Sequence, residues 1–254
     1  MGNILAIADK ELRSYFASPI AYIVLGFFTF LFGWFYVTIL SYFVQASMQM
    51  SQFGPQSVNI NQQMIRPLLQ NVTVLLLLVL PMITMRTYSE EKRSGTIELL
   101  LTSPLTDFQI ITAKFLGALA LYGTMLAITL IHIGVLYFYG GRPEWKTIVA
   151  AYFGLLLMGG CFLSVGLFIS SLTKNQIVAV MATFAVFLFL WIINWIGSFY
   201  PQIEPITSYL SIIEHFDDFA KGVIDTTHVI YYVSFITFGL FLTAKAVDSE
   251  RWRG

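Results

Sequence analysis

Six side chains that can bind a divalent metal or transfer protons lie close together near the C-terminal end of the chain. They are Glu214, His215, Asp217, Asp218, Asp225 and His228. Carboxylates and imidazoles are common metal ligands. No pair among them, however, has the spacing of a known ligand motif, and helix capping or a solvated helix face explains these acids equally well. We therefore assign no metal to this chain.

Other catalytic signatures are missing from the sequence. There is no GxxxxGK[ST] segment that would bind ATP, and neither HExxH nor GxSxG occurs. Glu90 and Glu91 resemble the start of the EExxxR pattern of membrane prenyl-protein proteases, but Gly95 stands where the arginine is needed. His132 lies in an apolar run, where a hydrogen bond to a neighbouring helix explains a neutral imidazole better than catalysis does. The sequence predicts a chain that is not itself an enzyme.

The composition indicates a membrane protein. Hydrophobic residues make up 57% of the 254 residues and charged residues only 11%, with a mean hydropathy of +0.75. A soluble domain has roughly a quarter of its residues charged. The net charge is zero, which gives no basic surface for nucleic acid. The single cysteine, Cys161, lies in an apolar run and forms no intrachain disulfide.

Six apolar runs are long enough to cross a bilayer, whose ~30 Å core needs about 20 helical residues. They cover residues 20–44, 68–85, 115–139, 147–171, 177–197 and 228–247. The runs are continuously apolar rather than alternating, which favours helices over strands. The first run is too long for a signal-peptide core, so we expect the N-terminus to be retained. The sequence predicts one all-α polytopic membrane domain over residues 1–254, with no separate soluble domain.

Basic residues predict the orientation of these spans. With the N-terminus in the cytoplasm, ten of the 14 Lys and Arg residues lie on the cytoplasmic side and four on the outer side. Six spans then return the C-terminus to the cytoplasm. We expect a multi-pass protein of the bacterial inner membrane with both termini cytoplasmic.

Two segments on the cytoplasmic side stand out from ordinary connectors. Residues 3–17 carry apolar side chains on one face and Asp9, Lys10 and Arg13 on the other, as in a helix lying in the membrane interface. The loop at 86–114 places a charged stretch before Gly95 and exposed leucines up to Pro104. Such a patch is typical of a protein interface. The alternative is an interfacial helix with its leucines in lipid.

Three further features concern packing and the outer side. Residues 198–227 have helical apolar spacing but too many charges to span, which predicts short helices that enter the outer leaflet and return. Residues 45–67 are polar and nearly uncharged, which indicates an irregular hydrated linker. The fourth span repeats small residues four apart, such as Gly166 and Ser170, which predicts close helix packing. The aromatic first and fifth spans could face lipid, an amphiphile pathway or a second copy.

Three stretches of this sequence resemble segments of ABC-2 type transporter permeases, and the resemblance extends over nearly the whole chain. They are KELRSYFASPIAY, PMITMRTYSEEKRSGTIELLLTSPLTDFQIITAKFLGA and HFDDFAKGVIDTTHVIYYVS. The likeness is greatest to the gliding-motility (GldF-like) and nitrous-oxide-reductase maturation (NosY-like) branch. The resemblance implies a type V exporter-like fold: six spans, an N-terminal interface helix, a cytoplasmic coupling helix and re-entrant helices before the last span.

The resemblance also implies partners and site residues. Such permeases work as dimers with two separate ATPase subunits, which bind the ATP and Mg, so that this chain binds no cofactor itself. A coupling helix within the loop 86–104 would dock on the ATPase. Its interface residues would be Glu90, Glu91, Lys92, Arg93, Gly95, Thr96, Glu98, Leu99, Leu100 and Pro104. The N-terminal helix would add Lys10, Glu11, Arg13 and Tyr15. The short helices at 203–224 would form an outer gate with Glu214, His215, Asp217 and Asp218.

Three functional classes remain in view at this point. The first is the membrane permease subunit, which couples ATP hydrolysis on the partner ATPase to export of an unknown substrate. The second is a mechanotransducing ABC membrane subunit that acts on a periplasmic auxiliary protein and moves no substrate through itself. The third, an intramembrane enzyme, is disfavoured by the missing motifs.

Overall fold

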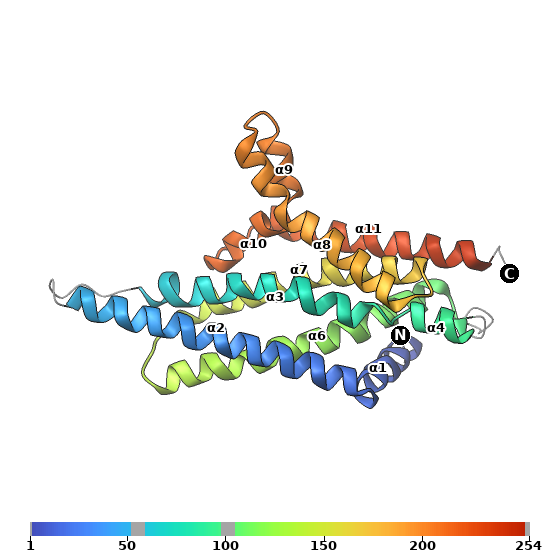
Figure 1. The fold of residues 1–254 in the computed structure, drawn as a ribbon, viewed down its shortest axis with the longest axis horizontal. Helices are drawn as coiled ribbons and strands as arrows, with labels where there is room; N and C mark the ends of the chain where they lie inside the picture. Colours follow the sequence, from blue (N-terminus) through green and yellow to red (C-terminus); the bar gives the residue numbers. More distant parts are fainter. Residues whose placement is uncertain (1, 52–58, 98–104, 252–254) are drawn as a thin grey trace.

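The computed structural model describes residues 2–51, 59–97 and 105–251, and all regular secondary structure in these ranges is helical. The longer helices are α1 (Gly2–Ala17), α2 (Pro19–Ser51), α3 (Arg66–Thr84), α6 (Asp107–Phe138), α7 (Trp145–Leu172), α8 (Gln176–Phe199) and α11 (Thr226–Arg251). The shorter ones are η1 (Asn61–Ile65), α4 (Ser89–Ser94), α9 (Glu204–Leu210) and α10 (Ile212–Ala220). Figure 1 shows their arrangement.

Six helical segments of the described chain are long and apolar enough to cross a membrane, which confirms the predicted all-α polytopic fold. The second of them runs through η1, α3 and α4, from Asn61 to Ser94. Its 34 residues would extend for about 50 Å at 1.5 Å per residue, well beyond a ~30 Å hydrocarbon core. The charged α4 at its end is therefore expected to project from the bilayer.

The prediction of an irregular linker over 45–67 is wrong at both ends. Helix α2 continues to Ser51, and the next segment begins with the π-helical turn η1 at Asn61. Residues 52–58 lie outside the described part of the chain. Met, Gln, Ala and Ser carry only small helix penalties, so α2 can extend past the apolar run that the hydropathy pattern delimits.

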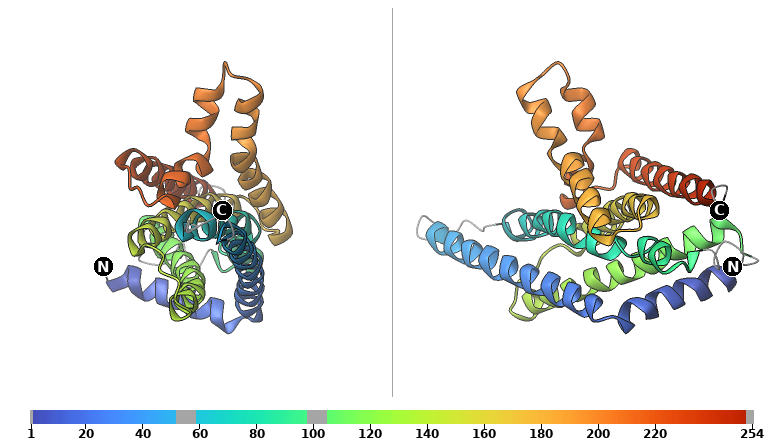
Figure 2. Two further views of the ribbon diagram at one scale, coloured as in Figure 1. Left: turned by 90° about the vertical axis from the view of Figure 1, so that its left-hand side faces the viewer. Right: turned by 45° about the vertical axis from the view of Figure 1, so that its right-hand side comes forward.

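Helices α3 and α7 form the centre of the bundle. In each, 67% of the most apolar window is buried, against 22% in α2, α8 and α11. Both chain termini lie at the same end, together with α1 and α4 (Figure 1). We name this the α4 end, and the opposite end, with η1 and α10, the α10 end. Helix α9 and the adjoining part of α8 project sideways from the bundle (Figure 2).

Glycines on α7 allow the neighbouring helices to approach closely, as the small-residue pattern predicts. A Cβ on Gly166 would lie 2.2 Å from Thr84 Oγ1 of α3, and one on Gly159 would lie 2.1 Å from the Tyr122 ring of α6. Neither neighbour is the free end of a long side chain, and both are fully buried. Without these glycines, α7 would have to move away from α3 and α6.

We expect Gly166→Ala to destabilise the protein by about 1–3 kcal/mol, the usual cost of overpacking a filled core. The measurement is the thermal unfolding midpoint of the detergent-solubilised chain. Gly123→Ala is the matched control, because a Cβ there meets nothing within 4 Å and alanine favours the helix. Equal midpoints for the two variants would contradict the close packing of α7 on α3.

Candidate functional site

A buried lysine joins three elements at the α4 end. The Lys114 side chain, in the second turn of α6, is only 1% exposed. Its Nζ donates to Glu11 Oε1 of α1 at 3.0 Å, to Glu91 Oε1 of α4 at 2.6 Å and to the Thr87 carbonyl at 3.2 Å. These three bonds use all three N–H groups of the ammonium. The two carboxylates offset the cost of burying the charge, which a lone ion in this position could not bear.

Close contact between α1 and α6 makes this junction possible. A Cβ on Gly117 would lie 2.8 Å from Glu11 Cβ and 3.3 Å from the Ala8 carbonyl oxygen. The glycine therefore lets α1 lie directly on α6, one turn from Lys114. On the same side of α1, the Tyr15 hydroxyl lies 3.2 Å from Thr87 Oγ1. Burial raises the pKa of Tyr15, so its hydroxyl stays protonated and can donate.

A second set of contacts holds α4 from the opposite side. Lys92, whose side chain is 2% exposed, pairs with Glu250 of α11 at 2.5 Å. The Ser170 hydroxyl of α7 accepts hydrogen bonds from the backbone N–H groups of Tyr88 and Ser89 and donates to the Met85 carbonyl. Helix α4 is thus tied directly to α6, α7 and α11, and through Lys114 to α1. It ends at Gly95, whose φ of +73° favours glycine.

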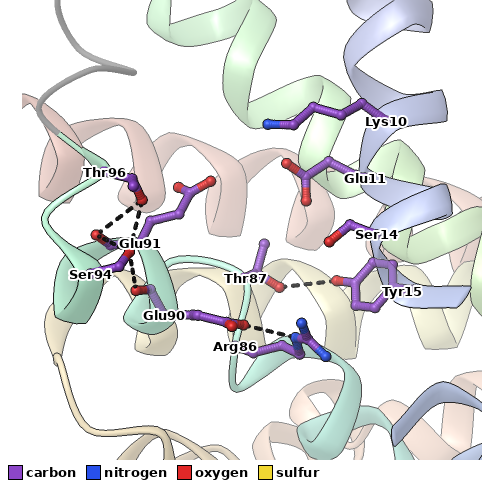
Figure 3. Close-up of a pocket in the computed structure, with 10 residues that line it drawn as sticks. All are labelled: Lys10, Glu11, Ser14, Tyr15, Arg86, Thr87, Glu90, Glu91, Ser94 and Thr96. Atoms are coloured by element: carbon purple, nitrogen blue, oxygen red, sulfur yellow. Dashed lines mark hydrogen bonds and ion pairs between the residues drawn. The ribbon is translucent and has the colours of Figure 1, made fainter. Parts of the chain in front are cut away.

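A polar cleft of about 230 Å³ opens between α1 and α4 (Figure 3). Its lining residues are Lys10, Glu11, Ser14, Tyr15, Arg86, Thr87, Glu90, Glu91, Ser94 and Thr96. Arg86 and Glu90 pair across one turn at 3.0 Å. Glu91 Oε2 is buried and has no hydrogen-bond partner among the described residues. The free Glu91 oxygen can accept a hydrogen bond from a polar or basic group, so the cleft is suited to binding such a group rather than to catalysis.

The structure assigns different roles to the residues predicted at the coupling interface. Glu91 and Lys92 face inward in ion pairs, so they position α4, whereas Arg93 and Thr96 are exposed. In α1, Glu11 is likewise turned toward Lys114, and Arg13 pairs with the exposed Asp9. The predicted residues Glu98, Leu99, Leu100 and Pro104 lie outside the described part of the chain.

Sequence reasoning missed the role of Lys114 as the hub of this site. We counted it only as one of the basic residues at the ends of the spans. A signal was present: Lys114 is followed by 27 residues without another charge, up to Arg142, so it begins a long apolar helix. Its partners Glu11 and Glu91 are 103 and 23 residues away in the chain, and no local pattern pairs them.

A second polar network lies at the α10 end. Asp217 accepts hydrogen bonds from Arg66 at 2.6 Å and Gln70 at 2.9 Å, and it also pairs with Lys221. Burial by itself raises the pKa of Asp217, but the hydrogen bonds from Lys221 and Arg66 outweigh it and bring the pKa below its ordinary value. This carboxylate therefore fastens α10 to the start of α3 as an anion.

Two histidines connect α10 to the last span. His215 Nε2 lies 2.9 Å from the Tyr209 carbonyl, His228 Nε2 lies 3.1 Å from Asp218, and the two Nδ1 atoms are 2.7 Å apart. Carbonyl and carboxylate oxygens only accept, so both Nε2 atoms must carry hydrogen for these bonds to form. The Nδ1 contact needs one more proton, which gives the pair a single positive charge. Among the described residues, no three metal-binding side chains converge as a metal site would require.

The histidine pair predicts a loss of local order at acidic pH. Burial lowers the pKa of His215, with a further contribution from His228. Once the pair holds its one shared proton, His215 resists a second one. Below about pH 6.5, the ordinary histidine value, both histidines of the unfolded segment bind a proton, one more than the folded pair holds. Stability that is present above pH 6.5 is thus lost as the pH falls through the folded pKa.

We therefore expect amide exchange in α10 to accelerate between pH 6.5 and 5.0, after correction for intrinsic exchange. His215→Gln should flatten this dependence, whereas the amides of α7 serve as the internal control. A dependence that is unchanged in the variant would contradict the assignment to His215.

The junction at the α4 end predicts a large effect of removing its cation. Lys114→Met leaves Glu11 and Glu91 as unpaired anions, and breaking a buried pair costs roughly 3 kcal/mol. The unfolding midpoint of the purified chain is the measurement. Arg13→Met is the control. The Arg13 and Asp9 side chains are 80% and 56% exposed, so their ion pair contributes at most about 1 kcal/mol.

Combining Lys114→Met with Glu11→Gln and Glu91→Gln should recover most of this stability, because no unpaired charge then remains buried. A Lys114→Met variant that melts like the Arg13→Met control would refute the structural role of the junction.

These features define a helical membrane protein whose non-spanning helices are braced against the bundle at both ends. The chain belongs to the ABC-2 family of transporter proteins, whose pattern matches residues 5–247. This finding confirms the resemblance to ABC-2 type permeases, while the GldF-like or NosY-like branch stays a prediction.

The chain is also similar to a curated transporter subunit. It is 27% identical over 147 residues to the probable multidrug ABC transporter permease YbhR of Escherichia coli K12, and equally similar to YbhR of strain O157:H7. The match takes in 56% of this chain but only 38% of YbhR.

Proposed function

We propose that this chain is the permease subunit of an ATP-binding cassette exporter of the inner membrane. A separate dimer of ATPase subunits would hydrolyse ATP with Mg, and this chain, paired with a second permease copy, would move a substrate outward. The observation that carries the proposal is the bracing of α4. A short charged helix beyond the spans is joined by buried ion pairs to α6 and α11, and Lys114 of α6 also pairs with α1.

The charge distribution supports a cytoplasmic α4 end. Ten of the 14 Lys and Arg residues lie in segments on the side of the N-terminus, as the positive-inside tendency requires. An ATPase that uses cytoplasmic ATP must dock on that side. In this orientation the α10 end faces outward, and Glu214, His215, Asp217 and Asp218 would belong to an outer gate.

The proposed mechanism is the transmission of a rigid displacement. When ATP closes the ATPase dimer, a docked α4 is pushed or released. The Lys114 junction passes that displacement to α6 and α1, and the Lys92–Glu250 pair passes it to α11. Each nucleotide state must favour a different arrangement of the spans, because a ligand that binds both arrangements equally shifts no population.

A mechanotransducing ABC subunit is the second candidate, and the projecting part of α8 and α9 favours it. Phe199, Ile206 and Tyr209 on this projection are 79%, 62% and 61% exposed. They offer an outer partner an apolar surface near the α10 end. The GldF-like or NosY-like assignment belongs with this candidate, since those systems act in gliding motility or cofactor maturation with a periplasmic auxiliary protein.

Charge reversal on the exposed face of α4 tests the docking of the ATPase. We expect Arg93→Glu to lower recovery of the ATPase subunit in co-purification about fivefold, equivalent to about 1 kcal/mol for one exposed charge. Lys146→Glu is the matched control, an exposed basic residue at the start of α7 near the α10 end.

Equal recovery of the ATPase subunit with both variants would overturn the interface assignment. If the interface holds, reconstituted vesicles distinguish the two functions. ATP-dependent substrate movement supports export, whereas ATP hydrolysis stimulated only by an outer partner protein supports mechanotransduction.

A further inference from the structure

Helices α6 and α11 leave an apolar groove between them near the α4 end. Both pack on α7: a Cβ on Gly160 would meet Ile236 of α11 at 2.9 Å and Phe115 of α6 at 3.7 Å. The groove in front of this contact has a volume of about 540 Å³. Its lining residues are Phe108, Ile111, Thr112, Phe115, Leu116, Thr237, Leu240, Phe241 and Ala244. The two threonine side chains are the only polar ones among them.

The groove has the length and direction of part of an acyl chain. Its lining on α11 runs from Thr237 to Ala244, which is about 10 Å along the helix. One leaflet contributes about 15 Å of hydrocarbon, half of the bilayer core. The groove therefore extends over much of one leaflet, parallel to the spans and open toward the lipid.

A positive charge lies at the mouth of this groove. Lys245 follows the lining residue Ala244, is exposed, and has its Nζ 5.8 Å from the centroid of the Phe241 ring. It forms no ion pair with another described residue. On α11 the acid Asp248 lies one turn beyond Lys245, and on α6 the acid Asp107 precedes the lining residue Phe108. Lys245 thus follows the apolar lining directly at the charged end of α11, where a basic side chain is expected to reach the membrane interface.

We infer that this groove binds one acyl chain of an anionic phospholipid, with its phosphate paired to Lys245. An apolar groove in contact with the bilayer is filled by chains, because an empty one loses dispersion contacts along its whole lining. The cation selects the headgroup, because a phosphate next to an ammonium at the interface gains attraction that a neutral headgroup lacks. This inference does not depend on the transport function.

Native mass spectrometry of the complete protein, extracted from vesicles of equal phosphatidylglycerol and phosphatidylcholine, tests the inference. We expect one phosphatidylglycerol to remain bound per chain. Ala244→Trp, which fills the groove, should abolish this adduct. Phe238→Trp, on the same helix but outside the groove lining, should retain it.

Lys245→Gln tests the headgroup separately. It should lower the preference for phosphatidylglycerol about fivefold, the ratio that corresponds to about 1 kcal/mol per lysine near an anionic surface. Equal retention of both lipids by the unmodified chain would overturn the anionic assignment. Retention of the adduct by Ala244→Trp would overturn the site. So would an Ala244→Trp variant that keeps the lipid but no longer self-associates, because the groove would then be a contact between two copies of the chain.

Discussion

The ammonium of Lys114, buried against Glu11 and Glu91, is the contact on which the α4 end depends. A charge removed from water is stable only if each of its hydrogens finds an acceptor, so the three elements that supply acceptors have fixed positions relative to one another. Gly117 permits the approach of α1 that brings Glu11 within reach, and Thr87 supplies the third acceptor. Helix α1, the turn after α3, helix α4 and the start of α6 consequently form one unit.

The same constraint gives α4 its mechanical character. A six-residue helix has almost no stability of its own, since helix nucleation is costly and few bonds repay it. Helix α4 is held instead by Lys114, by the Lys92–Glu250 pair and by the Ser170 hydroxyl. An external force on α4 therefore reaches α6, α11 and α7 without first being lost in local rearrangement. This property is what the proposed coupling to an ATPase requires.

The α10 end is built on different chemistry. Asp217 is an anion held by Arg66, Gln70 and Lys221, and the neighbouring histidine pair needs one shared positive charge for all its hydrogen bonds. The α4 junction is more deeply buried than this network, in which the Asp218 and Lys221 side chains are 39% and 44% exposed. The two ends of the bundle thus differ in their access to water, and the more exposed one responds to the pH of its surroundings.

The sequence by itself determined the fold class, the six spans and the close packing of α7, because apolar run length and small-residue spacing are local properties of the chain. It also determined which segments lie outside the spans, since their charges cannot enter lipid without partners. Only the tertiary structure decided which of those charges face inward. Glu91 and Arg93 belong to the same charged run, and the sequence does not show which of them faces inward. In the structure, Glu91 is paired with Lys114 and Arg93 is exposed. The pairings of Lys114 with Glu11 and of Lys92 with Glu250 join residues 103 and 158 positions apart, and only the tertiary packing of α1 and α4 on the spans brings them together.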